Sequence, residues 1–155
     1  MYFLPLLCMQ CNNPPCVKVC PTGASHKRDD GIVLMNYDRC IGCRYCEVAC
    51  PYDARCYVKE IKPYYGDQGF TPYENEMGKD HQTGVQEKCT FCAELVDKGE
   101  VPTCVAVCPA YARYFGDLDD PTSEINVLIK SRFGEQLHPE IGTDPAVFYI
   151  KMQAH

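Results

Sequence analysis

The sequence lacks the motifs that mark most enzymes, and it lacks apolar runs long enough to cross a membrane. Its 155 residues contain no glycine-rich nucleotide-binding motif, no zinc-protease motif and no nucleophile elbow. The acidic residues are scattered without a paired arrangement, and the histidines show no metal-ligand spacing. No apolar stretch approaches the roughly 20 residues that span a bilayer. The sequence therefore predicts neither a substrate site nor a membrane span.

An excess of positive charge and a targeting segment are also missing. The formal net charge of −6 argues against binding to nucleic acid or to an anionic membrane surface. No twin-arginine motif and no hydrophobic signal region precedes the first cysteine motif. If the protein works at a membrane or outside the cytoplasm, we expect a partner to take it there.

Cysteine, in contrast, is abundant, with thirteen residues in a chain of 155. This usage indicates a covalent or metal framework. Residues 40–51 spell C-x2-C-x2-C-x3-C-P, the bacterial ferredoxin motif, whose tight spacing directs three thiolates toward one iron–sulfur cube. In two-cluster ferredoxins the fourth cysteine ligates the other cluster, so one such motif predicts a second.

Two further quartets of cysteines follow the same plan. Residues 8–21 spell C-x2-C-x4-C-x3-C-P, and residues 89–109 spell C-x2-C-x11-C-x3-C-P. Twelve of the thirteen cysteines therefore fall into three quartets, each ending in Cys-Pro. The chain carries three versions of one unit, and we expect the clusters themselves to form part of the core.

The ferredoxin crossover rule assigns the ligands of the predicted 4Fe-4S clusters. The first cluster is predicted to use Cys8, Cys11, Cys16 and Cys50. The second is predicted to use Cys40, Cys43, Cys46 and Cys20. A third is predicted from Cys89, Cys92, Cys104 and Cys108. The rule provides no closing partner for this third cluster: Cys108 closes its own cube, or an N-terminal piece is missing, or the cluster is incomplete and labile.

Other uses of the cysteines fit the spacing less well. An all-thiolate site selects zinc or iron–sulfur, but structural zinc sites favour paired C-x2-C halves over the tight run at residues 40–46. A disulfide scaffold would leave one thiol over, and nothing in the sequence supports export of the free chain. The remaining Cys56 is expected to be a small buried thiol or a substitute ligand for the third cluster.

The pattern around the cysteines predicts a small, loop-rich α+β fold. A turn at residues 29–31 leads into a strand at 32–35, and a helix is expected at 93–98. The tail is expected to hold an amphipathic helix over 124–132, with Asp120 as its N-cap, and a final apolar strand.

We expect one compact domain with four consecutive parts. Residues 1–58 carry a crossed pair of ferredoxin motifs, and residues 88–118 carry the third motif. Residues 119–155 form the C-terminal helix and tail. Between the motifs, residues 59–87 are rich in glycine, proline, tyrosine and charge without a clear period, which predicts a long surface loop or insertion.

Three basic residues beside predicted ligands have two possible roles. Arg39, Arg44 and Lys88 each lie next to a cysteine or within a cysteine motif. Their charges could raise the reduction potential of a cluster, or they could be ordinary surface charges and ion-pair partners.

Several segments quoted in order resemble one known family. They are Pro-Pro-Cys-Val at 14–17, Cys-Pro-Thr-Gly-Ala at 20–24, Asp-Gly-Ile-Val at 30–33, Cys-Ile-Gly-Cys-Arg-Tyr-Cys at 40–46, Lys-Cys-Thr-Phe-Cys-Ala at 88–93, Phe-Gly-Asp-Leu at 115–118, Gly-Thr at 142–143 and Phe-Tyr-Ile at 148–150. These segments resemble the iron–sulfur subunits of the dimethyl sulfoxide reductase family. The resemblance covers essentially the whole chain.

The resemblance implies a tandem bacterial ferredoxin-like fold and a non-catalytic, electron-transfer role beside a molybdopterin-containing catalytic subunit. Complexes of this family reduce polysulfide, thiosulfate, tetrathionate, arsenate or dimethyl sulfoxide, usually with an integral membrane subunit that exchanges electrons with quinone. The chain would then be membrane-associated through partners, on the periplasmic or the cytoplasmic face. The family pattern has four quartets, so we expect this chain to lack the first. The alternatives are a free soluble multi-cluster ferredoxin and a structural zinc-binding protein.

Overall fold

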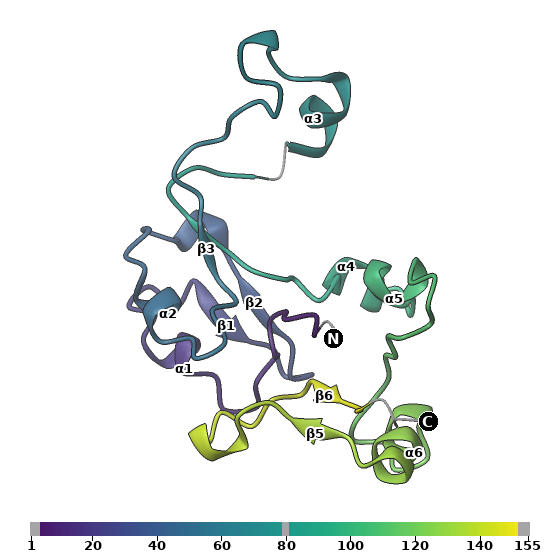
Figure 1. Ribbon diagram of the computed structural model, residues 1–155. Helices are drawn as coiled ribbons and strands as arrows, with labels where there is room; N and C mark the ends of the chain where they lie inside the picture. The colour runs from purple at the N-terminus through teal and green to yellow at the C-terminus, as the bar shows by residue number, and fades with distance from the viewer. Residues whose placement is uncertain (1–3, 79–80, 152–155) are drawn as a thin grey trace. The chain divides into compact units, whose positions relative to one another are not determined.

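The computed structural model describes residues 4–78 and 81–151 as short helices joined by loops and three two-stranded sheets (Figure 1). The paired strands are β1 (Ser25–Lys27) with β2 (Val33–Met35), β3 (Cys56–Tyr57) with β4 (Gln86–Glu87), and β5 (Glu135–Gln136) with β6 (Phe148–Tyr149). The α-helices are α1 (Pro15–Lys18), α2 (Tyr45–Val48), α3 (Pro72–Met77), α4 (Ala93–Val96), α5 (Thr103–Ala106) and α6 (Glu124–Arg132). The 3-10 helices are η1 (Tyr37–Arg39), η2 (Gly66–Gln68) and η4 (Pro139–Ile141). Short helices and short strands agree with the predicted α+β class. None of the described helices is long and apolar enough to span a membrane.

The chain forms two compact units, each assembled from separate stretches of sequence. The first unit contains Met1–Leu6, Pro15–His26 and Leu34–Lys88. The second contains Leu7–Pro14, Lys27–Val33 and Cys89–His155. The predicted boundaries near residues 58, 87 and 118 remain predictions.

In the first unit, helices α1 and α2 pack against each other. Each has only four residues, too short to be stable alone, so tertiary contacts must hold both. Each helix also buries a cysteine, Cys16 in α1 and Cys46 in α2. The core of this unit therefore consists partly of thiols.

The predicted insertion contains more regular structure than a loop. Its two ends pair as β3 and β4, and the ladder continues through Val58, whose amide donates to Val85 at 2.9 Å. Helix α3 lies between them and begins with a capping box, in which Thr71 and Glu74 cap each other, followed by proline at the first helical position. The prediction of a structureless loop was therefore wrong over the described part, which omits residues 79–80.

In the second unit, the segment of the first two cysteines lies along the C-terminal tail. The amide of Ala146 donates to the carbonyl of Met9 at 2.9 Å, and the amide of Asn12 donates to the carbonyl of Asp144 at 2.7 Å. The side chain of Met9 is almost completely buried. Residues distant in sequence are thus joined by backbone hydrogen bonds near these cysteines.

The predicted tail helix is confirmed at α6, but its predicted N-cap is wrong. The N-cap position is Ser123. Asp120 instead accepts hydrogen bonds from the amide of Thr122 at 2.8 Å and from its hydroxyl at 2.7 Å, which closes a local turn. Asn126 holds this turn from the helix by donating to the carbonyl of Leu118 at 2.9 Å and to that of Asp120 at 2.7 Å.

Candidate metal centres

A pocket in the first unit is walled by cysteines from two different quartets. The cysteines are Cys20, Cys40, Cys43 and Cys46. The other lining residues are Thr22, Ala24, Met35, Ile41, Arg44 and Gln86. Cys46 is buried, Cys20 and Cys40 are half-buried, and Cys43 is exposed. The pocket therefore offers four sulfur donors arranged from the interior to the surface.

Local backbone conformation places these sulfurs around one space. Cys40 directly follows η1. Gly42 and Arg44 both adopt left-handed backbone conformations, with φ of +66° and +64°, and so turn the backbone ahead of α2, which carries Cys46. Cys20 comes from the other quartet, two residues after the end of α1. The crossing of quartets follows from the packing of α1 on α2.

Glycine at position 42 allows the insertion to close over the cysteine loop. A Cβ atom at Gly42 would overlap the carbonyl oxygen of Gly84 and lie 3.2 Å from the ring of Tyr57. Both of these neighbours belong to the β3–β4 region. The tight approach brings the start of β4 to the pocket, where it contributes the side chain of Gln86.

The environment of Cys20 favours its thiolate. Burial raises the pKa of this thiol, but hydrogen bonds from the Ser25 amide, the Thr22 hydroxyl and the amides of Thr22 and Ala24 together outweigh burial, so the net pKa is lowered. The Ser25 amide donates to the sulfur at 3.4 Å. Deprotonated sulfur is the form that binds metal.

A buried arginine, which no sequence motif indicates, lies beside the pocket. Arg55 donates to the hydroxyl of Ser25 at 2.7 Å, and its other terminal nitrogen lies 3.6 Å from the sulfur of Met35. Burial raises the pKa of the Cys46 thiol, while the charge of Arg55 and a hydrogen bond from it act in the opposite direction. Arg55 therefore faces the deepest cysteine of the pocket.

Gln86 is a second pocket residue that the sequence did not indicate. Its Nε2 donates to the carboxylate of Glu47 at 2.7 Å, and Arg44 donates to the same carboxylate at 2.8 Å. The hydrogen bonds from Arg44 and then from Gln86 lower the pKa of Glu47. Arg44 also lies over the ring of Tyr57, 5.2 Å from its centroid. The buried Oε1 of Gln86 accepts no hydrogen bond from the described residues.

The first predicted ligand set draws on both units. Cys8 and Cys11 belong to the second unit, whereas Cys16 and Cys50 belong to the first. Cys11 and Cys16 are buried, and Cys8 and Cys50 are half-buried. This set of four remains a prediction.

The third quartet lies wholly within the second unit. Its members are Cys89, Cys92, Cys104 and Cys108. The sulfur of Cys92 is 3.8 Å from the hydroxyl of Thr103, the first residue of α5, which links the two halves of the quartet. The amide of Ala112 donates to the sulfur of Cys108 at 3.4 Å and is the main reason that the pKa of this thiol is lowered. Closure of a cluster by Cys108 remains a prediction.

The thirteenth cysteine is not buried. Cys56 is exposed on β3, with its sulfur 3.9 Å from the carbonyl oxygen of the next residue, Tyr57. The expectation of a small buried thiol was therefore wrong. Within residues 4–78 and 81–151, no three histidine, cysteine or acidic side chains are placed to hold a single metal ion.

The donor set of the pocket fits an iron–sulfur cube. Its four cysteines supply thiolate ligands only, which select zinc or iron–sulfur. They surround a space rather than converging on one point, and a neighbouring backbone amide donates to one of the sulfurs. Hydrogen bonds to sulfur, local charge and burial are the features that set the reduction potential of such a cluster.

Comparison with known proteins agrees with this chemistry. The family model described as a 4Fe-4S dicluster domain matches residues 1–65 and 67–118. The chain is 47% identical over 150 residues to the putative dimethyl sulfoxide reductase iron–sulfur subunit of Halobacterium salinarum, covering 97% of this chain and 55% of that protein. It is 47% identical over 160 residues to the Hdr-like menaquinol oxidoreductase iron–sulfur subunit 1 of Archaeoglobus fulgidus, covering 97% and 58%.

A third relative has a related name. The chain is 42% identical over 144 residues to the matching component of polysulfide reductase from Wolinella succinogenes, covering 92% of this chain and 64% of that protein. The chain thus spans little more than half the length of these curated relatives. The dicluster model covers most of the chain, and its ferredoxin-like fold agrees with the short helices and strands described above. This protein is therefore a member of the 4Fe-4S dicluster family that includes the iron–sulfur subunits of dimethyl sulfoxide and polysulfide reductases.

Proposed function

We propose that the chain is a non-catalytic electron-transfer subunit with a tandem ferredoxin-like fold. It relays single electrons through 4Fe-4S clusters, from or to a membrane subunit linked to quinone and a molybdopterin-containing catalytic subunit. The observation that carries this proposal is the pocket walled by Cys20, Cys40, Cys43 and Cys46, in a chain of the dicluster family. The names of the relatives support the reductase context. Association with a membrane occurs through the partners.

The ligand sets of this proposal are those that the motifs predict. The pocket cysteines hold one cluster, and the second set is Cys8, Cys11, Cys16 and Cys50. A third cluster uses Cys89, Cys92, Cys104 and Cys108. A bound cluster takes up and releases one electron at a time. The chain contributes the thiolates, the amides that donate to them and the partial exclusion of water.

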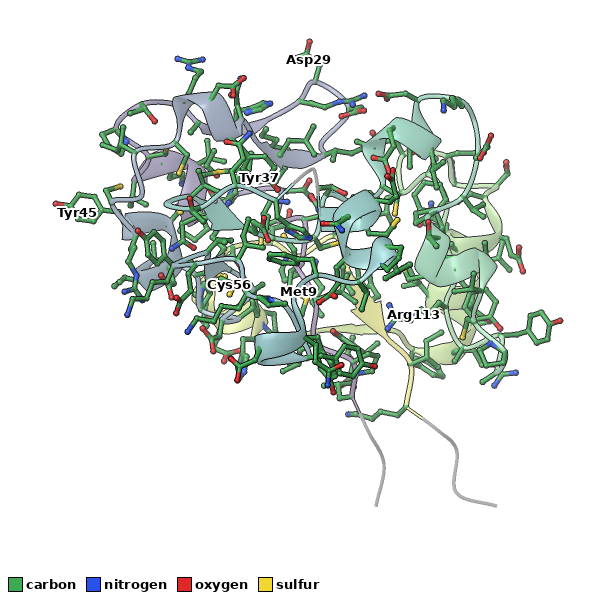
Figure 2. All side chains as sticks on the ribbon, turned by 90° about the horizontal axis from the view of Figure 1, so that it is seen from above. Met9, Asp29, Tyr37, Tyr45, Cys56 and Arg113 are labelled. Carbon is green, nitrogen blue, oxygen red and sulfur yellow. The ribbon has the colours of Figure 1, made fainter. Side chains whose placement is uncertain are left out.

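The rim of the pocket supports contact with another protein. Ile41 is part of the pocket wall and is exposed, and Tyr45 and Val48 on α2 are exposed as well. Figure 2 shows the ring of Tyr45 projecting from the molecule. Exposed apolar side chains gathered at a functional site favour a surface that a partner covers. A free carrier would have less reason to expose them.

Anaerobic purification followed by iron and sulfide analysis tests the proposal. We expect about eight irons per chain from two cubes, or about twelve if the third forms, with EPR signals after reduction. Cys46→Ser should remove about four irons, whereas Cys56→Ser, at the exposed cysteine outside the quartets, should remove none. Stoichiometric zinc in place of iron would overturn the proposal.

A further inference from the structure

The side chain of Arg55 is fixed behind the wall of the cysteine pocket. Only 5% of its surface is exposed. It donates to the hydroxyl of Ser25 at 2.7 Å, and the amide of Ser25 donates in turn to the sulfur of Cys20 at 3.4 Å. Its other contact, Met35, lines the pocket. The guanidinium is therefore one residue away from the pocket on two sides.

A second arginine, Arg44, lines the same pocket from its solvent side. Its side chain is 56% exposed, and it pairs with Glu47 at 2.8 Å. A paired and exposed charge is largely screened by water and salt. A buried charge is screened much less, so its interaction with a nearby group is stronger. The two arginines therefore differ in environment while sharing one pocket.

We propose that Arg55 raises the reduction potential of the cluster held by Cys20, Cys40, Cys43 and Cys46, and that Arg44 contributes little. This inference rests on the proposed function, because it requires a cluster in the pocket. Reduction adds one negative charge to a group that four thiolates already make negative, and a fixed cation stabilises the added charge. Because a guanidinium stays protonated throughout the physiological range, the contribution does not depend on pH there.

The anchoring of Arg55 adds a second reason for its effect. Its hydrogen bond to the Ser25 hydroxyl holds the residue whose amide faces Cys20. Hydrogen bonds to cluster sulfurs raise the potential by stabilising negative charge. A neutral residue that keeps the hydrogen bond separates this positional role from the charge itself. Glutamine is such a residue.

The test compares Arg55→Gln, Arg55→Lys and Arg44→Gln with the unchanged 155-residue chain, all loaded anaerobically. Iron and sulfide are counted first, and each midpoint potential is then measured by EPR-monitored redox titration at low and high salt. The relevant signal is identified as the one that Cys43→Ser alters. For Arg55→Gln we expect at least a tenfold lower ratio of reduced to oxidised cluster at a fixed potential, which corresponds to about 59 mV for one electron. For Arg44→Gln we expect less than a threefold change, and salt should reduce it further.

The outcomes separate this inference from the proposed function. An unchanged chain without iron would overturn the proposed function, whereas a loaded Arg55→Gln with an unchanged midpoint would overturn only the role of Arg55. An equal shift in Arg44→Gln would overturn it as well. If Arg55→Gln does not load, Arg55→Lys decides. A loaded lysine variant within threefold of the unchanged chain supports the charge role, and a larger fall or a failure to load contradicts it.

Discussion

The last cysteine of a quartet accepts hydrogen bonds from the backbone that follows it. The amide of Ser25 donates to Cys20, and the amide of Ala112 donates to Cys108, both at 3.4 Å. In both cases the pKa of the thiol is lowered, at Cys20 against the opposing effect of burial. The recurrence in two quartets indicates that the turn after Cys-Pro itself directs amides toward sulfur. These thiols are therefore prepared for metal binding, which requires their deprotonated form.

Gly42 provides a sharp test at the scale of one residue. Alanine there would keep the left-handed φ, at a cost of about 1–2 kcal/mol, and would also push its Cβ into the carbonyl oxygen of Gly84. We expect Gly42→Ala to lose about four irons per chain, because the cysteine loop must shift. Gly69→Ala is the matched control, since Gly69 has φ of +76° but no atom within 4 Å of the added Cβ. Equal iron contents in the two variants would contradict the role assigned to this contact.

At the scale of elements, local signals were predictable and long-range pairings were not. The turn at 29–31 has Gly31 at φ of +90°, and α6 spans the predicted residues, because turn chemistry and helical pattern are local. Helix α3 was missed although a capping box and a proline mark its start. The pairing of β3 with β4 joins residues separated by the whole insertion, and no short pattern encodes it. This pairing places Gln86 at the pocket.

The basic residues show the same limit from another side. Arg39, Arg44 and Lys88 were selected because they adjoin cysteines in sequence, yet Arg44 is exposed and paired with Glu47. Arg55 adjoins only the exposed Cys56 and is nevertheless the buried cation beside Cys46. Burial of a charged side chain depends on tertiary packing, which adjacency in sequence does not reveal. The cysteine motifs are not subject to this limit, because tight spacing itself restricts ligand geometry.

In the second unit, one ion pair connects the turn after β1 to the end of α4. Arg28 donates to Asp97 at 2.6 Å and to Asp30 at 2.7 Å. The hydrogen bond from Arg28 lowers the pKa of Asp97, so the stabilisation is complete above the ordinary value of 3.8 and is lost only as pH falls through the lowered value. At neutral pH we therefore expect Arg28→Gln to accelerate amide exchange at Gly31, whose amide donates to the carbonyl of residue 28. Salt should diminish the difference between variant and unchanged chain.

A matched control for this ion pair lies in the insertion. Lys62 pairs with Glu60 at 2.7 Å, but the two residues are neighbours in one loop. Lys62→Gln should leave exchange at Gly31 unchanged. If both variants changed this exchange equally, net charge rather than the connection to α4 would explain the effect.

At the scale of the whole molecule, the side chains alone form a thin core. In the described residues, ten apolar side chains are buried, and three of these are the cysteines Cys11, Cys16 and Cys46. Helices of four residues and strands of two or three cannot persist without tertiary support. Folding is therefore expected to depend on the clusters, in the way that small metal-binding domains depend on their metal.

Removal of iron tests this dependence directly. Treatment of the loaded chain with an iron chelator, in the presence of a thiol reductant that prevents disulfides, should abolish cooperative thermal unfolding and make the chain sensitive to protease. Reconstitution with iron and sulfide should restore both properties, because the ligands are then held together again. The same treatment of Cys56→Ser should give the same result, since that thiol lies outside the quartets. An iron-free chain that keeps its circular dichroism spectrum and melts cooperatively would show that packing of the side chains suffices, and the clusters would then not be required for folding.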